Sequence, residues 1–164
     1  MAERSVESVE SGAGGTSSGA SVSADVAPSK ERHERARRGT WRVAVAEQSM
    51  VPTLLSGDWL LLDPTTDAWP RRGSVVVFRE PGSNVLAIKR VAARPGDRVR
   101  ISAGILHLGP DEAWLLGDNG GPSLDSRRYG PVPLEALVGR AWFRYGPRNR
   151  IGLIGRPRTV RSDR

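Results

Sequence analysis

The sequence has no cysteine, only two histidines and no long apolar run. The absence of cysteine from its 164 residues excludes disulfides, thiol nucleophiles and thiolate metal sites. His33 and His107 are too few for a histidine-rich metal site, so we expect no metal and no cofactor. Apolar runs such as Trp59–Leu62 fall far short of the ~18 residues of a membrane-spanning helix. The start of the chain also lacks the apolar core of a secretory signal, which predicts a cytoplasmic protein.

Positive charge is concentrated at the C-terminal end of the chain. The formal net charge is +7, and residues 148–164 contribute six arginines against one aspartate. Residues 43–147 carry twelve basic and eleven acidic side chains, so the body of the protein is nearly neutral. Such a domain is unsuited to following a phosphate backbone, and we expect no nucleic-acid partner. The basic tail could contact an anionic membrane surface weakly, which makes membrane association the alternative location.

The N-terminal part of the chain differs in composition from the rest. Residues 1–30 are mainly Ser, Gly, Ala and Glu, which bury too little apolar surface to offset the entropy lost on ordering. Residues 31–42 are charged and could form a short helical lead-in. A basic binding patch is one interpretation, but Glu31 and Glu34 dilute the charge and favour a solvated linker. The sequence thus predicts a disordered leader at 1–40, one folded domain at 41–147 and a basic tail at 148–164.

From Val43 onward, short β-branched or leucine-rich runs alternate with Gly, Pro and Asp. Many short strands separated by turn residues are typical of an all-β barrel or sandwich. Two segments, 51–55 and 133–136, look instead like helical turns. The expected strands are Trp59–Leu62, Ser74–Arg79, Val85–Ala92, Arg98–Ile101, Ile105–Leu108, Ala113–Leu116 and Leu137–Tyr145.

The predicted folded domain contains a single lysine. The chain has 23 arginines and two lysines, and because Lys30 lies in the leader, only Lys89 remains. A desolvated lysine can lose its proton and act as a base, whereas arginine cannot. Burial in an apolar row would lower the pKa of Lys89, but an edge-strand lysine that reaches water fits equally well. Side chains alternate along a strand, so Lys89 would share one face with Val85, Ala87 and Val91, opposite Leu86 and Ile88.

Two further segments could supply chemistry. Ser49 lies at a predicted strand-to-turn junction, where its hydroxyl could be exposed and turn N–H groups could face an oxyanion. A helix N-cap is the commoner role for a serine in such a place. The segment 117–127 is dense in Asp, Asn and Ser, and Asp125 and Arg127 are spaced to pair within a loop. A pinned active-site loop and an ordinary turn-rich loop both fit this composition.

Together these segments resemble the type I signal peptidases, the S26 serine/lysine peptidases. The resemblance runs from about Val43 to Gly146, and the order and spacing of its motifs make it specific. It implies a compact β-barrel core of the kind shared with repressor-type proteases, with few short helical turns. The matching motifs are Ser49–Leu54 with Gly57-Asp58, Gly73–Phe78, Ile88–Val91 with Pro95–Asp97, Gly117–Asn119, Ser123 with Asp125–Arg127, Tyr129–Pro133 and Leu137–Ala141.

The resemblance also implies roles for the matching residues. Ser49 would be the nucleophile, with its backbone N–H in the oxyanion hole, and Lys89 would be the general base. The substrate would be a precursor protein whose N-terminal peptide lies extended beside the strand before Ser49. The implied supporting residues are Ser123, which would hydrogen-bond the Lys89 amine, the structural pair Asp125 and Arg127, and Asp118 and Asn119, which would brace that loop.

The sequence departs from the family's pattern in three ways. It lacks an N-terminal membrane anchor, and the stretch from Asp97 to Gly117 is too short for the family's large second β-domain. Glu47 and the segment 120–122 differ from the small, hydroxyl or polar residues of relatives. A short, anchor-free chain with the phrase Glu47–Leu54 resembles the nickel-type superoxide dismutase maturation proteases. This resemblance implies removal of an N-terminal extension from the dismutase precursor.

Three other functions stay open at this stage. The chain could be a signal peptidase that acts on secretory preproteins. An autocleaving repressor-type protein would need a DNA-binding helical domain, which residues 1–42 do not suggest. A non-enzymatic β-barrel binding module with a degenerate site draws its best support from Glu47.

Overall fold

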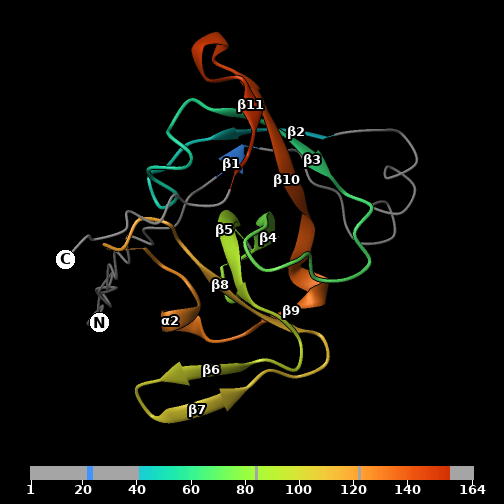
Figure 1. Ribbon diagram of the computed structural model, residues 1–164, viewed down its shortest axis with the longest axis vertical. Helices are drawn as coiled ribbons and strands as arrows, with labels where there is room; N and C mark the ends of the chain where they lie inside the picture. Colours follow the sequence, from blue (N-terminus) through green and yellow to red (C-terminus); the bar gives the residue numbers. More distant parts are fainter. Residues whose placement is uncertain (1–21, 24–40, 84, 122, 156–164) are drawn as a thin grey trace, which may run out of the picture.

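Antiparallel strands are the main regular structure of the described residues. The computed structural model describes residues 22–23, 41–83, 85–121 and 123–155. A nine-stranded sheet has the order β1-β2-β3-β10-β4-β5-β8-β9, with β11 added to β10, and β6 and β7 form a separate two-stranded sheet (Figure 1). The strands are β1 (Val22–Ser23), β2 (Trp41–Val45), β3 (Trp59–Asp63), β4 (Val75–Arg79), β5 (Leu86–Ala93), β6 (Arg98–Ile101), β7 (Gly104–His107), β8 (Glu112–Leu116), β9 (Val132–Pro133), β10 (Leu137–Gly146) and β11 (Gly152–Leu153).

The all-β prediction is confirmed, but the predicted closed barrel is not found in the described part of the chain. The main sheet runs from β1 to β9, and these end strands pair only with β2 and β8. Each has two residues, and the two end strands do not pair with each other. The helical elements are equally short: α2 (Ser126–Tyr129), η1 (Leu134–Ala136) and η2 (Arg148–Arg150).

The central strand β5 is buried on both faces. The alternation of its side chains between these faces decides which residues lie beside Lys89. Leu86 and Ile88 pack in one apolar cluster, whereas Ala87 and Val91 pack in the other. This division confirms the predicted faces of β5. Val85 differs from the prediction because it lies outside the strand and is 40% exposed. Its carbonyl instead accepts the Glu80 N–H and closes the turn before β5.

All seven predicted strands are present, and no end differs from the prediction by more than one residue. The strand β2 was not among the expected strands, and its first residues, Trp41 and Arg42, belong to the segment 31–42, for which a solvated linker or a short helical lead-in was expected. Both expectations were wrong for these two residues because they pair with Leu62 and Leu61 of β3; residues 31–40 lie outside the described residues. The 51–55 segment forms hydrogen-bonded turns, not a helix, and 133–136 contains η1.

The predicted leader and tail also contribute strands. Val22–Ser23, within the leader, form β1; the rest of the leader lies outside the described residues. Within the predicted tail, η2 and β11 turn back so that Leu153 and Gly152 pair with β10. The β11 loop and the β6–β7 hairpin lie at opposite ends of the molecule, with β4 and β5 between them (Figure 1).

Candidate active site

The structure brings the lone lysine of the domain to Ser49. The Lys89 Nζ donates a hydrogen bond to the Ser49 Oγ at 2.9 Å, although 40 residues separate them in the chain. Lys89 lies on β5 opposite Val76 of β4 and is 0% exposed, and Ser49 is 7% exposed. Of the two interpretations left open by the sequence, the buried lysine is therefore correct. A primary amine and a hydroxyl in this arrangement can exchange a proton.

Burial lowers the pKa of the Lys89 amine below its ordinary value. The carboxylates of Glu80, Asp125 and Glu47 act in the opposite direction and raise this pKa, but desolvation is the larger effect. Glu80 follows Val76 and Phe78 at alternate positions from β4, so it continues the row of side chains that faces Lys89. Only the neutral amine can accept a proton. A lowered pKa increases the fraction of Lys89 that is neutral at a given pH.

The turn that carries Ser49 is fixed by Asn119. The Asn119 N–H donates to the Ser49 carbonyl at 3.0 Å, and its side-chain amide donates to the Gln48 carbonyl at 3.2 Å. The turn also holds itself together, because the Val51 N–H bonds to the Gln48 carbonyl and the Leu54 N–H to that of Met50. The resemblance implied that Asn119 braces its own loop; its two contacts here are to the backbone of Gln48 and Ser49.

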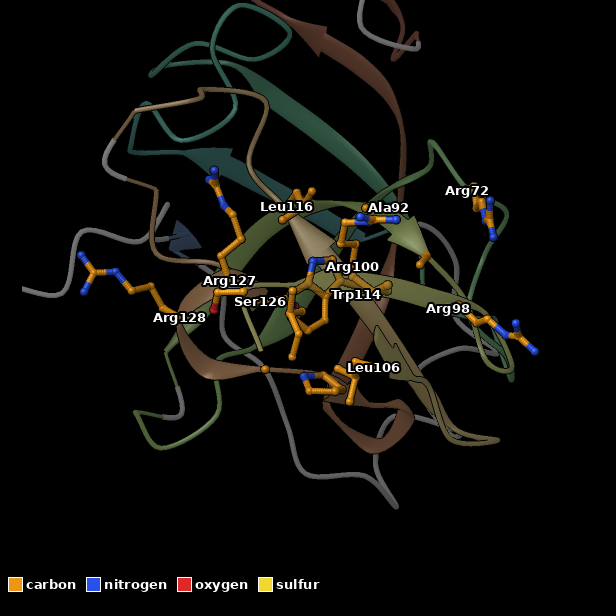
Figure 2. A pocket seen from close by; sticks show the side chains of 16 residues that line it. Arg72, Ala92, Arg98, Arg100, Leu106, Trp114, Leu116, Ser126, Arg127 and Arg128 are labelled. Atoms are coloured by element: carbon orange, nitrogen blue, oxygen red, sulfur yellow. The ribbon is translucent and has the colours of Figure 1, made fainter. Parts of the chain in front are cut away.

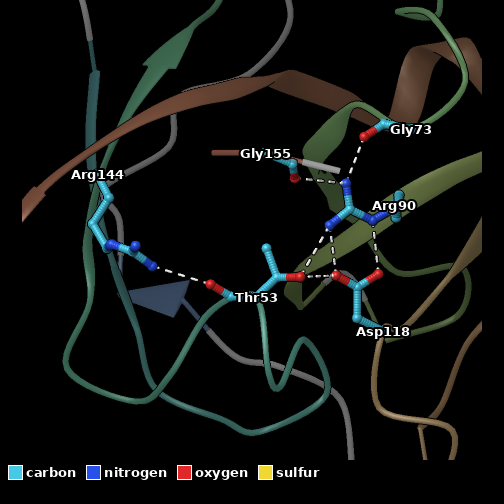
Figure 3. A network of polar contacts seen from close by, with 6 residues as sticks. All are labelled: Thr53, Gly73, Arg90, Asp118, Arg144 and Gly155. Atoms are coloured by element: carbon cyan, nitrogen blue, oxygen red, sulfur yellow. Dashed lines mark hydrogen bonds and ion pairs between the residues drawn. The ribbon is translucent and has the colours of Figure 1, made fainter. Parts of the chain in front are cut away.

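Asp118 belongs to a buried network that the sequence did not reveal (Figure 3). Arg90 donates two hydrogen bonds to Asp118, from Nε at 2.7 Å and from Nη2 at 2.6 Å. The same guanidinium donates to the Gly73 and Gly155 carbonyls, and the Thr53 hydroxyl donates to Asp118 at 2.5 Å. Side-chain exposure in the ion pair is only 9% for Arg90 and 5% for Asp118. This network holds Asp118 in place and, through it, the neighbouring Asn119.

A second charged cluster supports the other side of the same turn. Arg144 donates to the Thr53 carbonyl at 3.0 Å (Figure 3). It also pairs with Asp58 at 3.2 Å. Asp58 is 1% exposed, accepts the Leu55 N–H and also pairs with Arg150. Thr53 therefore connects two ion-pair networks, one through its side chain and one through its backbone. Nothing in the spacing of Arg144 or Arg150 along the sequence pointed to this role.

Asp125 and Arg127 form the pair that the sequence predicted. Arg127 donates to both carboxylate oxygens of Asp125, at 2.9 and 2.7 Å, and its backbone N–H also bonds to Asp125 at the start of α2. The other partner is the Gly117 N–H at 3.1 Å. Burial alone would raise the pKa of Asp125, but the hydrogen bonds from Arg127 and Gly117 lower it overall. The carboxylate therefore stays charged and ties α2 to the end of β8.

Ser123 does not make the bond predicted for it. Its hydroxyl is buried and has no hydrogen-bond partner, so the expected contact with the Lys89 amine is not formed. The residue instead packs against Gly117, where a Cβ atom would lie 2.3 Å from the Ser123 Oγ and 2.7 Å from the Ser49 carbonyl oxygen. Only glycine fits at this close approach. Ser123 thus lies beside the Ser49 backbone without bonding to the amine.

A groove rimmed by arginines lies elsewhere, between β6, α2 and the ends of β5 and β8 (Figure 2). Its volume is about 890 Å³, and neither Ser49 nor Lys89 lines it. Trp114, Leu116 and Leu106 lie between arginines on either side in Figure 2. Arg127, which pairs with Asp125, is the link between this groove and the loop near the dyad.

Comparisons with known proteins agree with this arrangement. The family model described as signal peptidase, peptidase S26 matches residues 40–109 and 107–146. The chain is 32% identical over 146 residues to a signal peptidase I of Leptolyngbya laminosa, covering 69% of this chain and 72% of that protein. It is 34% identical over 142 residues to a probable signal peptidase I-2 of Synechocystis sp., covering 67% and 65%. A mitochondrial inner membrane protease subunit 1 of Schizosaccharomyces pombe is 36% identical over 107 residues, covering 57% and 68%.

Within the part of the chain that the structure describes, no helix is long and apolar enough to cross a membrane. The matched segments include Ser49, Lys89 and the loop that carries Asp118, Asn119, Ser123 and Asp125. The match spans well over half of the chain, and two relatives are more than 30% identical over most of its length. The chain therefore belongs to the signal peptidase, peptidase S26 family, and it is a serine endopeptidase of the signal peptidase I type.

Proposed function

We propose that Ser49 is the nucleophile and Lys89 the general base of this peptidase. The observation that carries the proposal is the 2.9 Å contact between the Lys89 Nζ and the Ser49 Oγ. The lowered pKa of the buried amine supports it, because a base must be neutral before it can accept a proton. Asn119 and Asp118 act by positioning the Ser49 turn, and the Asp125–Arg127 pair acts by holding α2 against β8.

The reaction then proceeds in two halves. Neutral Lys89 takes the Ser49 hydroxyl proton while the Oγ attacks the scissile carbonyl carbon and forms a tetrahedral intermediate. The carbon–nitrogen bond breaks, the Lys89 ammonium gives its proton to the leaving amine, and an acyl-enzyme remains. Water attacks the ester carbonyl, Lys89 accepts the proton of that water, and the proton returns to the Ser49 oxygen as the acid leaves. Each half-reaction restores the neutral amine.

A serine-directed probe on the intact chain tests these roles. We expect a fluorophosphonate probe to label the wild type, and Ser49→Ala to abolish both labelling and cleavage. Lys89→Arg should also abolish labelling, since arginine fills the site but cannot give up its proton. Ser56→Ala, which changes an exposed serine outside the dyad, is the matched control and should label normally. Labelling that survives Ser49→Ala would refute the assignment.

For the substrate, we propose the signal peptide of a secretory preprotein. The support comes from the relatives named signal peptidase I, which cover most of this chain. The nickel-type superoxide dismutase precursor is the second candidate, and it rests on the resemblance of Glu47–Leu54 followed by Gly57–Leu60. Both substrates would present an extended peptide near the N-terminus of a precursor.

Mass measurement of the product N-terminus separates the two candidates. Purified protein is incubated with a preprotein and, separately, with the dismutase precursor, each alongside the Ser49→Ala variant. Cleavage of the preprotein alone supports the first candidate, and cleavage of the dismutase precursor alone supports the second. Cleavage that persists with Ser49→Ala would come from a contaminating peptidase and would count for neither.

A further inference from the structure

The edge of β2 that leads to Ser49 is already occupied by another part of the same chain. Val22 and Ser23 of β1 pair antiparallel with Val45 and Ala44, the last residues of β2 before the Ser49 turn. The same short strand contacts β5, the strand that carries Lys89. Figure 1 places β1 beside β2 and next to the upper end of β5. A two-residue segment of the N-terminal region therefore lies between the elements that supply the two dyad residues.

A peptide that adds to β2 must take the place of β1. Along its other edge β2 pairs with β3 over four residue pairs, from Trp41 with Leu62 to Ala44 with Trp59. A strand has two hydrogen-bonding edges, so the edge used by β1 is the one at which an extended peptide could pair. Two strands cannot share that edge. Binding of an extended substrate beside β2 and retention of β1 are therefore mutually exclusive.

The short length of β1 indicates that a substrate could displace it from the edge of β2. It makes two residue pairs with β2, and so short a pairing is marginal by itself. Because β1 and β2 belong to one chain, their pairing is intramolecular, and such a linkage raises the effective concentration of β1 at this edge. The segment is thus held at the edge strongly enough to compete with a substrate and weakly enough to leave.

We infer that residues 22–23 act as an intramolecular competitor at the peptide-binding edge of β2, which a substrate displaces before Ser49 can act. The inference rests on the proposed function for its kinetic consequence. A competitor of this kind raises the KM of every extended substrate by a common factor and leaves kcat unchanged. It also protects the Ala44 backbone amide from exchange with solvent, because the neighbouring Val45 N–H bonds to the Asp58 carbonyl and the Ala44 N–H therefore points to the β1 edge.

Proline substitutions in the full-length chain test the competitor. Proline lacks the N–H that a strand ladder needs, so the double variant Val22→Pro/Ser23→Pro should abolish pairing with β2. We expect KM for a short extended peptide substrate to fall several-fold with kcat unchanged. Ala13→Pro/Gly14→Pro, placed earlier in the same N-terminal region, is the control and should leave KM at the wild-type value. An unchanged KM in the Val22/Ser23 variant would overturn the inference.

A readout without catalysis separates this inference from the proposed function. Hydrogen exchange at Ala44, measured in the Ser49→Ala background, should quicken on introduction of the two prolines. Faster exchange in this background, together with no cleavage by the chain that retains Ser49, would support the competitor and refute the peptidase roles of Ser49 and Lys89. Normal cleavage, with exchange and KM unchanged by the two prolines, would support the peptidase roles and refute the competitor.

Discussion

The buried ion pair between Arg90 and Asp118 should be worth more to this protein than any surface pair. Arg90 donates five hydrogen bonds, and neither side chain of the pair is more than 9% exposed. Removing one member leaves the other charge buried without its partner, which typically costs about 3–5 kcal/mol. We therefore expect Arg90→Met to lower the free energy of unfolding by about that amount.

Replacing both members should recover most of the loss. In Arg90→Met/Asp118→Leu no unpaired charge remains, and exchange of a buried pair for apolar residues is often neutral or stabilising. The Gly73 and Gly155 carbonyls still lose their donor, so we expect a residual cost of about 1–2 kcal/mol. The control is Arg72→Met, because the Arg72 side chain in its pair with Asp97 is 61% exposed and such pairs contribute about 1 kcal/mol or less.

Urea unfolding followed by the fluorescence of the five tryptophans measures all these changes. Activity gives a second readout, because loss of Asp118 should release Asn119 from the Ser49 carbonyl. A misplacement of the nucleophile by about 1 Å can cost about a hundredfold in rate. The double variant should therefore stay slow while its stability recovers. The reasoning would be refuted if Arg90→Met cost no more than Arg72→Met, or if the double variant lost the sum of the two single losses.

Three further predictions follow from the buried charges. Activity should rise as the pH increases through the lowered pKa of Lys89. Because the Glu80 carboxylate raises that pKa, Glu80→Gln should move the rise to lower pH. A pH–rate profile that is the same in the variant and the wild type would contradict this prediction. Lys89→Met should raise the urea midpoint at neutral pH. The folded protein binds fewer protons at Lys89 than the unfolded chain does, so the advantage should shrink as pH rises toward the ordinary lysine pKa; an advantage that grows with pH would be opposite in sign. Asp125→Ala should lower the free energy of unfolding by about 1–3 kcal/mol, because the Gly117 N–H loses its acceptor and α2 loses its N-cap. The same variant should also lower kcat. If unfolding and kinetic assays show both quantities unchanged, a supporting role for Asp125 is excluded.

The sequence was most informative where a local rule decides the outcome. Alternation along β5 placed Lys89 on the face of Ala87 and Val91, because side-chain direction in a strand depends only on position. The pairing of Asp125 with Arg127 was equally accessible, since two residues separate them. Both features required no knowledge of how distant segments meet.

The remaining features depend on long-range contacts. Arg90 reaches Asp118 and Thr53 across 28 and 37 residues, and no spacing rule connects such positions. Trp41 has charged neighbours typical of a linker, yet pairing with Leu62 of β3 makes it a strand residue. Ser123 was assigned from the family motif, and its actual position depends on the close approach to Gly117. Tertiary packing decided each of these cases.

Two adjacent residues of β5, Lys89 and Arg90, carry basic side chains that differ in whether they can lose their proton. The pleat sends Lys89 toward Ser49 and Arg90 toward Asp118, so one strand supplies a removable proton on one side and a permanent charge on the other. A slip of one residue in the pairing of β4 with β5 would reverse the two sides and set a guanidinium against the hydroxyl. Insertions in the turn from Pro81 to Ser83 are thus harmless only if they leave the Val76–Lys89 match intact. A change in the length of this hairpin is therefore compatible with the dyad only when the alternation of faces along β5 is kept.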